Sequence, residues 1–407
     1  MWRRRSTTEQ RTRVLIIVEN LLVPLDRRVW QEACVLRDAG HEVTVICPRM
    51  RGYTQAEEIL DGIQIYRHWI SDEARGIRGF FEYSTALWGE MRCALKAWRR
   101  GRFDVIHLCN PPDLLFLIAL PFKLLGDVKV IYDVHDLWPE MFEAKFGKRG
   151  LLYWAVRLAE RCTLALADAV MATNQSVLAT VKQRGNKSAD EVFIARTAPN
   201  TLDTNAPVDV GLKKGKRFLV GHIGVMGNAD GAHYLIEAAQ HIIHTRGRSD
   251  VQFLLIGSGP EHAELVRLRD SLGLANSIDM PGRVLNEFLF TALQTMDLGV
   301  ACDPINDYND YNDHCTMNKT LEYMAFSKAQ VMFGTREGRF SAGDAALYVM
   351  ENSAALLGDA ILELLDDEPR RQQMGVLGHE RLTTELSWSR SIEALRKAYA
   401  RAGGWVR

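Results

Sequence analysis

Residues 312–325 carry the side chains best suited to chemistry, because a polar segment here leads into an apolar-periodic helix. Thr316 or Asn318 can cap that helix, since a side-chain oxygen of either residue type accepts from an unpaired backbone N–H. The free amides and the positive end of the helix dipole suit a phosphate, and Lys319 adds a full positive charge. Glu322 lies one turn further on the same face, within reach of a sugar hydroxyl.

The same stretch has a purely structural alternative. An ordinary capped helix needs no ligand, and Glu322 could close a capping box onto Lys319 or Thr320. The sequence leaves both interpretations open at this point.

A second group of polar residues follows strands in the first half of the chain. Asn20 comes after the first strand, and Asp26 is expected to cap the next helix. Arg27 and Arg28 could meet a phosphate or an anionic acceptor, or could simply be solvated. His135-Asp136 directly follows another strand, where an active-site loop is expected; Asp136 could instead cap a helix.

Buried strands alternate with amphipathic helices along the whole chain. Continuous apolar runs are typical of parallel strands covered on both faces. The runs lie at 14–18, 43–46, 63–66, 105–108, 128–132, 169–172, 218–223, 251–256, 278–280, 298–301 and 331–333. Helices are expected between them, for example at 84–100 and 151–166. The pattern predicts two consecutive doubly wound α/β domains with ligands at the carboxyl ends of the strands. The first unit lacks a Gly-x-Gly-x-x-Gly loop, which disfavours an oxidoreductase.

Composition narrows the class of protein. A chain of 407 residues with 47% hydrophobic and 25% charged residues fits a soluble protein of two domains. The formal net charge of -1 gives no reason to expect nucleic acid as a partner. Seven scattered cysteines argue for a reducing compartment and against a disulfide framework or a zinc site.

The chain shows no segment that would predict secretion or membrane insertion. The basic N-terminus is not followed by an apolar core, and the apolar run 114–120 is shorter than the roughly 20 residues that span a bilayer. We expect a cytoplasmic protein. The basic face of the helix at 84–100 leaves open a peripheral contact with the inner, anionic face of a membrane.

Several segments, taken in order, resemble the family-4 glycosyltransferases of the GT-B fold. They are Arg27-Arg28-Val29-Trp30, Ala39-Gly40-His41-Glu42-Val43, Phe103-Asp104-Val105-Ile106-His107, Tyr132-Asp133-Val134-His135-Asp136, Leu255-Ile256-Gly257-Ser258-Gly259-Pro260, Gly282-Arg283-Val284 and Lys319…Glu322-Tyr323-Met324-Ala325. The resemblance spans residues 14–350. It implies two Rossmann-like domains that face a central cleft, with a boundary near residue 200.

The resemblance also implies an activity. The enzyme would transfer a sugar from a nucleotide diphosphate sugar with retention of the sugar's anomeric configuration. It would require no metal, and no cofactor beyond the UDP- or GDP-sugar that serves as co-substrate. Residues 201–387 would hold the donor. Residues 1–200, completed by a C-terminal helix at 388–407, would hold a glycan or lipid-linked acceptor. Envelope or exported polysaccharide synthesis is the setting the family suggests.

Family roles transfer to particular residues. Glu322 would bind the ribose, the amides near Thr316 and Asn318 would meet the diphosphate, and Arg283 would lie beside the base. His135 would make a polar or orienting contact at the reacting sugar. The expected catalytic residues are His135 and Lys319. The donor side adds Gly224, Gly257, Arg283, His314, Thr316, Asn318 and Glu322, and the acceptor or phosphate side has Asn20, Asp26, Arg27, Arg28 and Asp136.

The sequence departs from the family pattern in two places. The first glutamate of the usual Glu-x7-Glu pattern is replaced by His314. The Arg and Lys pair of the second domain's glycine-rich loop is also missing, its positions corresponding to about Met226 and to Asp230. Lys319 is the leading replacement and Arg283 the next, since a departing diphosphate needs positive charge or donors. A sugar-nucleotide epimerase of the same fold and a catalytically silent scaffold subunit stay as alternatives.

Overall fold

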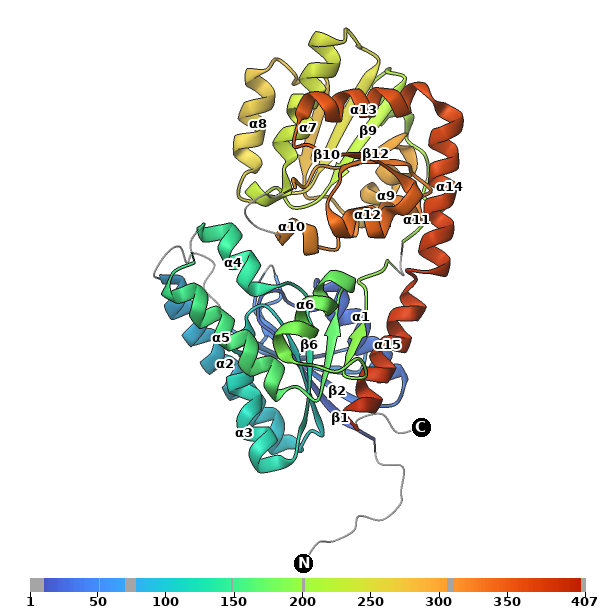
Figure 1. Ribbon diagram of the computed structural model, residues 1–407. Helices are drawn as coiled ribbons and strands as arrows, with labels where there is room; N and C mark the ends of the chain where they lie inside the picture. The colour runs from blue at the N-terminus through green and yellow to red at the C-terminus, as the bar shows by residue number, and fades with distance from the viewer. Residues whose placement is uncertain are drawn as a thin grey trace, which may run out of the picture. The chain divides into compact units, whose positions relative to one another are not determined.

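The protein is described by a computed structural model, which covers residues 11–50, 52–69, 78–147, 149–199, 202–305 and 311–403, with only the backbone for 78–83. The chain divides into two compact units. Unit 1 comprises Met1–Thr197 and Ser389–Arg407, and unit 2 comprises Ala198–Trp388 (Figure 1). Among the helices of the described residues, none is long and apolar enough to cross a membrane.

Unit 1 is built on an eight-stranded sheet in the order β3-β4-β2-β1-β5-β6-β7-β8. All neighbouring strands are parallel except β3 and β4. The strands are β1 Arg13–Val18, β2 Glu42–Pro48, β3 Glu57–Leu60, β4 Ile63–His68, β5 Val105–Cys109, β6 Lys129–Val134, β7 Ala169–Ala172 and β8 Val192–Ile194. The strand order reverses direction between β1 and β5, so the edge where these strands end is the expected place for a ligand.

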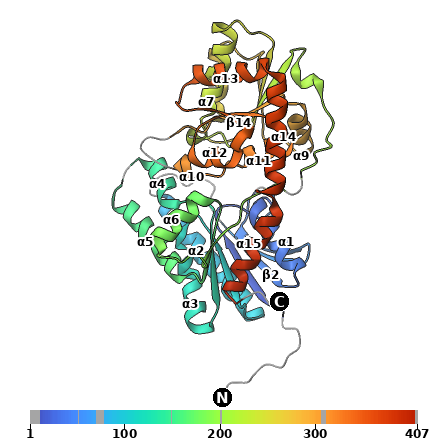
Figure 2. The ribbon, with the colours of Figure 1, turned by 45° about the vertical axis from the view of Figure 1, so that its right-hand side comes forward.

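Helices cover both faces of this sheet (Figures 1 and 2). Apolar side chains of α2, α3, α5 and α6 pack on one face, and those of α1 and α15 pack on the other. The helices of unit 1 are α1 Arg27–Asp38, α2 Arg78–Arg100, α3 Phe116–Gly126, α4 Trp138–Phe146, α5 Leu151–Leu166, α6 Gln175–Gly185 and α15 Trp388–Arg401. The last helix is tied to the rest of unit 1 by Ser391, whose Oγ accepts from the backbone N of Arg196 at 2.9 Å.

Unit 2 has a six-stranded sheet in the order β11-β10-β9-β12-β13-β14, with all neighbours parallel. The strands are β9 Phe218–Ile223, β10 Val251–Ile256, β11 Ile278–Gly282, β12 Leu298–Ala301, β13 Gln330–Phe333 and β14 Ala346–Val349. In chain order this is the 3-2-1-4-5-6 arrangement of dinucleotide-binding folds. Its switch point, where ligands are expected, lies between β9 and β12.

The helices of unit 2 also lie on both faces of its sheet. Side chains of α7, α8 and α13 build one core, and side chains of α9, α11 and α14 build the other. The helices are α7 Ala232–Gln240, α8 His262–Ser271, α9 Asn286–Thr295, α10 Tyr311–His314, α11 Asn318–Ala325, α12 Arg336–Ala342, α13 Ala354–Asp366 and α14 Glu368–Thr384. The predicted doubly wound α/β architecture is confirmed.

The predicted helix bounds and helix caps are confirmed at some positions and wrong at others. The helix predicted at 151–166 is α5 with the same bounds, and Asp26 caps α1 by accepting from the backbone N of Val29 at 3.1 Å. The expectation that Thr316 or Asn318 caps α11 is wrong. The N-cap is Met317, whose side chain makes no capping hydrogen bond, because the helix begins at Asn318 itself.

Candidate functional site

The carboxyl edge of unit 2 brings a buried lysine to the switch point of its sheet. Gly224 directly follows β9, and Asp303 follows β12 by two residues. Lys319 lies in the first turn of α11 and places its Nζ 2.9 Å from both carboxylate oxygens of Asp303. Three elements that are distant in sequence therefore meet at the position where this fold type binds phosphates.

The ion pair keeps Lys319 charged although its side chain is buried. Burial lowers the pKa of a lysine, but the Asp303 carboxylate more than offsets this, so the pKa of Lys319 is raised. The charges of Lys319 and Asp303 also act on the nearby carboxyl group of Asp230. Burial is the largest influence on Asp230 and, with the nearby Asp303, raises its pKa to about 6 despite the attraction of Lys319.

His222 supplies a neutral acceptor beside this lysine. Its Nδ1 lies 3.0 Å from the carbonyl oxygen of Val300, and burial lowers the pKa of the imidazole to about 3. The ring is therefore neutral, with the proton on Nδ1 donated to that carbonyl. Among the described residues, Nε2 of His222 has no hydrogen-bond partner, and it lies 3.6 Å from the point where a Cβ on Gly224 would stand.

Two glycines make room for this arrangement. A Cβ on Gly224 would lie 3.2 Å from Nζ of Lys319, so any side chain there would press on the amine. Gly257 follows β10 with φ +145, and a Cβ on it would lie 1.8 Å from the carbonyl oxygen of Gly224. Gly257 therefore allows the loops after β9 and β10 to approach closely, and Gly224 leaves room for the amine of Lys319.

The start of α11 and the residues before it are held firmly. Asn312 is buried and donates to the carbonyl oxygens of Ala229 and Pro304, each at 2.9 Å. Asp313 accepts from the backbone N of Arg336 at 2.7 Å. These contacts fix α10, which carries His314, and the segment that leads through Thr316 to α11.

The remaining donor-side candidates lie on two different elements. Glu322 is buried on α11, one turn after Lys319. Arg283 is exposed in the loop that follows β11, which is separated from β9 by β10. Arg283 therefore stands further along the carboxyl edge than the Lys319–Asp303 pair.

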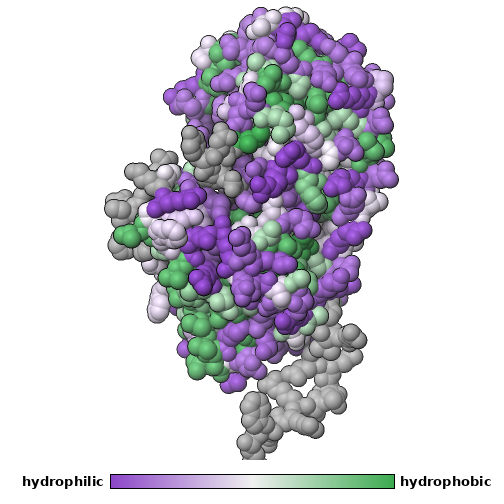
Figure 3. All heavy atoms as spheres, viewed as in Figure 1, coloured by the Kyte–Doolittle hydropathy of each residue, from purple (hydrophilic) through white to green (hydrophobic). Residues whose placement is uncertain are grey.

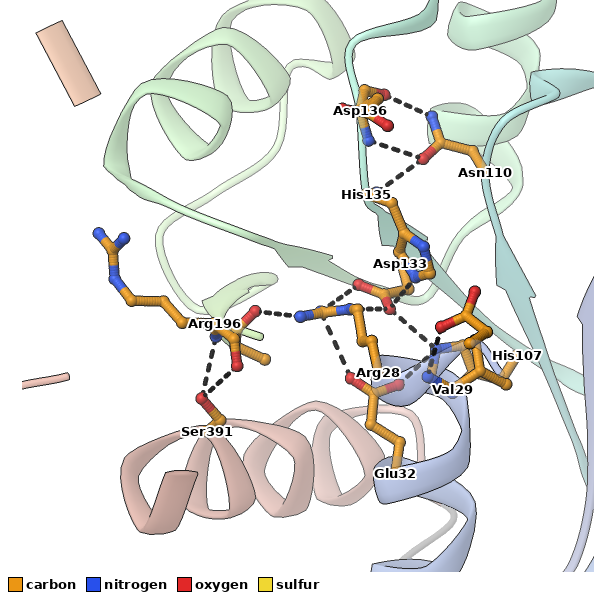
Figure 4. A network of polar contacts seen from close by, with 12 residues as sticks. Arg28, Val29, Glu32, His107, Asn110, Asp133, His135, Asp136, Arg196 and Ser391 are labelled. Atoms are coloured by element: carbon orange, nitrogen blue, oxygen red, sulfur yellow. Dashed lines mark hydrogen bonds and ion pairs between the residues drawn. The ribbon is translucent and has the colours of Figure 1, made fainter. Parts of the chain in front are cut away.

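In unit 1, His135 is held by Asp133 at the carboxyl end of β6 (Figure 4). Its Nε2 lies 2.8 Å from Oδ2 of Asp133. Burial lowers the pKa of this histidine, but the charge of Asp133 and this hydrogen bond outweigh burial and raise it above 6.5. The imidazole is therefore oriented and biased toward its charged form.

Asn110, which follows β5, fixes the backbone of the same loop. Its Oδ1 accepts from the backbone N of His135 at 2.7 Å and of Asp136 at 3.3 Å, and its Nδ2 donates to the carbonyl oxygen of Asp136 at 2.7 Å (Figure 4). The same Nδ2 lies within hydrogen-bond distance of Asp113 and Tyr132. The cap of α4 is Leu137, so Asp136 does not cap that helix.

Arg28 is engaged inside unit 1. Its Nε and Nη2 donate to the two carboxylate oxygens of Asp133 at 2.7 and 2.6 Å, and Glu32 lies 3.4 Å from Nη2. Burial opposes ionisation of Asp133, but Arg28 holds its pKa well below the usual range. Burial raises the pKa of Glu32 to about 7. We assign Arg28 to positioning Asp133, and hence His135, rather than to binding a phosphate.

The other acceptor-side candidates lie at the start of α1 and in the bend after β1. Asp26 is buried and caps α1, and Arg27 is exposed at the first position of that helix. Asn20 is exposed in the bend after β1. These residues come from the carboxyl end of β1, next to β5 in the sheet.

One group of side chains in unit 1 is close enough to share a cation. Potential ligand atoms of His107, Cys109 and Asp133 all lie within 4.8 Å of one another. The donor set does not suit a metal, because Asp133 already accepts from Arg28 and His135. Burial also raises the pKa of the Cys109 thiol well above its usual range, which disfavours the thiolate that metals require.

Asp303, Asp133 and Asn110 were not identified from the sequence as site residues. Each follows or ends a parallel strand, which is the one sequence signal that could have found them. The hydrogen-bond partners of these three side chains lie 2 to 105 residues away in the sequence. The folded structure is therefore needed to show which residue each side chain contacts.

Comparison with known proteins gives two matching family models. Residues 25–197 match a "Glycosyl transferase 4-like domain", and residues 217–367 match "Glycosyl transferases group 1". Together the two matches cover most of the chain. A comparison with curated protein sequences gives no significant match.

Solved structures of the same fold match over almost the whole chain. Sucrose-phosphate synthase from Thermosynechococcus elongatus is 17% identical with a TM-score of 0.76, over 96% of this chain and 99% of its own. Anabaena HepE in complex with UDP and glucose is 13% identical with a TM-score of 0.72, over 96% and 99%. WaaG, a glycosyltransferase involved in lipopolysaccharide biosynthesis, is 13% identical with a TM-score of 0.68, over 94% and 98%.

Proposed function

The chain belongs to the GT4-type glycosyltransferases of the GT-B fold, and we propose that it moves a sugar, with retention, from a UDP- or GDP-sugar to a glycan or lipid-linked acceptor. Unit 2 would bind the donor and unit 1 the acceptor. The donor would be a co-substrate, and no metal or other cofactor would be needed.

The observation that carries this proposal is the buried Lys319 at the switch point of unit 2. Its amine lies beside Gly224 and is held by Asp303. A diphosphate placed along β9 would meet this cation, the backbone at Gly224 and Gly257, and the first amides of α11. The lysine thus supplies the positive charge that the missing Arg and Lys pair would otherwise provide.

Lys319 has the properties needed to stabilise a leaving group. When the bond between sugar and phosphate breaks, negative charge grows on the departing diphosphate. A cation already oriented in a desolvated position stabilises that charge without further reorganisation. Glu322 would accept from the ribose hydroxyls, Arg283 would lie near the base, and His314, Thr316 and Asn318 would contact the sugar and phosphates.

In unit 1, His135 would contact the reacting sugar and Asp136 would lie beside it. Asp133 and Asn110 fix that histidine in place. Asn20 and Arg27 would meet the acceptor, next to the capping Asp26. We assign no protein base, because an oxygen of the departing phosphate can take the acceptor's proton.

The relatives support the substrate class and the setting. HepE is described with UDP and glucose, and WaaG acts in lipopolysaccharide biosynthesis. These descriptions support our proposal that the reaction belongs to envelope or exported polysaccharide assembly, on the cytoplasmic side of a membrane. The alternatives are a sugar-nucleotide epimerase, which needs no acceptor, and a silent scaffold subunit, which needs no nucleotide.

The proposal is tested by following free nucleotide released from UDP- and GDP-sugars, with and without a glycan or lipid-linked acceptor. Release that depends on the acceptor is the result expected of a transferase. Conversion of the nucleotide sugar without any acceptor would instead identify an epimerase, and failure to bind nucleotide would favour the scaffold.

A further inference from the structure

Three neighbouring helices of unit 1 expose an unusual number of large apolar side chains. The helices α2, α3 and α5 pack on the same face of the sheet. Trp98 of α2 and Phe122 of α3 have ring centroids 5.3 Å apart, and Lys123 of α3 donates to the carbonyl oxygen of Leu166 of α5 at 2.7 Å. The outer sides of the three helices therefore form one continuous surface, which we call the α2–α3–α5 surface.

The middle helix of this surface is apolar on its outer side. Leu117, Pro121, Leu124 and Leu125 are its exposed residues, and Leu125 is 90% exposed. Their spacing of four, three and one residues places them along one side of the helix. Apolar residues gather over this helix at the lower left of Figure 3. A helix whose outer side is entirely apolar is unusual for a surface that faces only water.

The flanking helices add exposed tryptophans and arginines. On α2 the outward side carries Trp88, which is 67% exposed, with Arg92, Leu95 and Arg99 at helical spacing. On α5 it carries Leu151, Trp154, Leu158 and Arg161, and Trp154 is 62% exposed. Tryptophan and arginine combine an apolar body with a polar or charged end, a combination that suits the boundary between water and lipid.

The charge on the α2–α3–α5 surface has one sign. In the described side chains of these three helices the acidic residues are Glu90 and Glu160, and both are buried. The exposed basic residues are Arg92, Lys96, Arg99, Arg100 and Arg161. Lys96 and Arg100 pair with Glu57, whereas Arg92, Arg99 and Arg161 form no ion pair within the described part of the chain. The surface is therefore apolar and positive.

We propose that the α2–α3–α5 surface docks unit 1 onto an anionic phospholipid bilayer. The leucines and tryptophans enter the boundary between head groups and acyl chains, and the arginines meet lipid phosphates. The inference goes beyond the proposed transfer reaction and does not depend on it, because none of these side chains belongs to either candidate site.

The test is sedimentation of the full chain with vesicles of phosphatidylcholine alone or mixed with phosphatidylglycerol. The wild type should bind the anionic vesicles more tightly, and added salt should weaken that binding. Arg92→Ala with Arg99→Ala should weaken it about twenty-fivefold, at about fivefold per basic residue. Trp154→Ser with Leu158→Ser should weaken it at least about tenfold through lost apolar burial.

Matched controls lie on unit 2. Arg267→Ala and Leu285→Ser remove an exposed arginine and an exposed leucine elsewhere, and both variants should bind vesicles as the wild type does. Failure of the wild type to bind anionic vesicles, or equal binding by the surface variants, would overturn the proposal. So would a wild-type dimer in analytical ultracentrifugation that Trp154→Ser with Leu158→Ser converts to a monomer, because the surface would then belong to a second copy of the chain.

Discussion

The amine of Lys319 lies 2.9 Å from each carboxylate oxygen of Asp303, and the two side chains are only 7% and 8% exposed. The pair joins the start of α11 to the end of β12. Its geometry explains how a lysine can be buried and still charged before a phosphate arrives. It also means that the cation is already oriented when the donor binds.

A buried pair of this kind predicts a characteristic stability pattern. Lys319→Met should lower the free energy of unfolding by about 3–5 kcal/mol, because Asp303 would be left buried without its partner. Adding Asp303→Leu should recover much of that loss, since the pair would be replaced by apolar side chains. Urea denaturation of both variants measures the difference. A single variant as stable as the wild type would show that the pair is not buried as described.

The glycines of the donor side should respond differently to alanine. Gly257→Ala should destabilise unit 2 by more than the about 1–2 kcal/mol expected from a left-handed backbone alone, because its Cβ meets the carbonyl oxygen of Gly224. Gly273→Ala is the control, since Gly273 also has positive φ but open space around it. Thermal unfolding of both variants gives the comparison. Equal losses would contradict the close approach of the two loops.

Gly224→Ala should act mainly on the ligand. Its Cβ would stand 3.1 Å from Cε and 3.2 Å from Nζ of Lys319, so the lysine would have to shift by a few tenths of an ångström. We expect weaker nucleotide binding with little change in thermal stability. A variant that binds nucleotide as the wild type does would place the phosphates elsewhere.

His135 predicts a pH dependence with a definite sign. Its pKa in the folded protein is raised, so it binds its proton more tightly than in the unfolded chain, where the pKa is about 6.5. The stability it contributes is fully present below about pH 6.5 and is lost as the pH rises through the folded value. The stabilising difference between wild type and His135→Gln should therefore shrink as the pH rises above about 6.5. An NMR titration of His135 with a midpoint below 6.5 would contradict this.

Asn110 should contribute more stability than an ordinary asparagine. Asn110→Ala removes the contacts to the backbone of His135 and Asp136 and leaves these polar groups unpaired. We expect a loss of about 2–4 kcal/mol in the free energy of unfolding, together with slower transfer. Asn205→Ala, at an exposed position, should change stability by no more than about 0.5 kcal/mol. Similar losses of unfolding free energy in the two variants would show that Asn110 does not stabilise the loop that carries His135 and Asp136.

Most strands of both sheets could be predicted from the sequence because buried parallel strands leave continuous apolar runs. The edge strands β3 and β14 were not predicted, because each is short and partly exposed. The run at 14–18 lies within β1, and the periodic segment at 151–166 is α5. The cap of α11 could not be predicted in the same way. Thr316 and Asn318 are both good capping types, but the helix begins at Asn318, with Met317 at the cap.

The site was predictable only in part. Lys319, Gly224 and Gly257 could be chosen from motif and spacing, but the partner of Lys319 could not. Asp303 follows β12, and only the packing of α11 beside that strand brings it to the lysine. Arg28 shows the reverse case. As a charged residue beside an expected site it suggested a ligand contact, yet the fold turns it inward to Asp133.

Calorimetric titration of UDP and of GDP into wild type, Lys319→Ala and the control Arg267→Ala shows whether the buried lysine binds the phosphates. Lys319→Arg, which keeps the charge, and a thermal melt of each variant show that any loss is not due to unfolding. We predict that one nucleotide binds the wild type and Arg267→Ala equally. Lys319→Ala should weaken that binding about ten- to a hundredfold, as expected for a charge-assisted phosphate contact. If neither nucleotide binds the folded wild type, or if Lys319→Ala binds as tightly, the buried lysine is not the phosphate site.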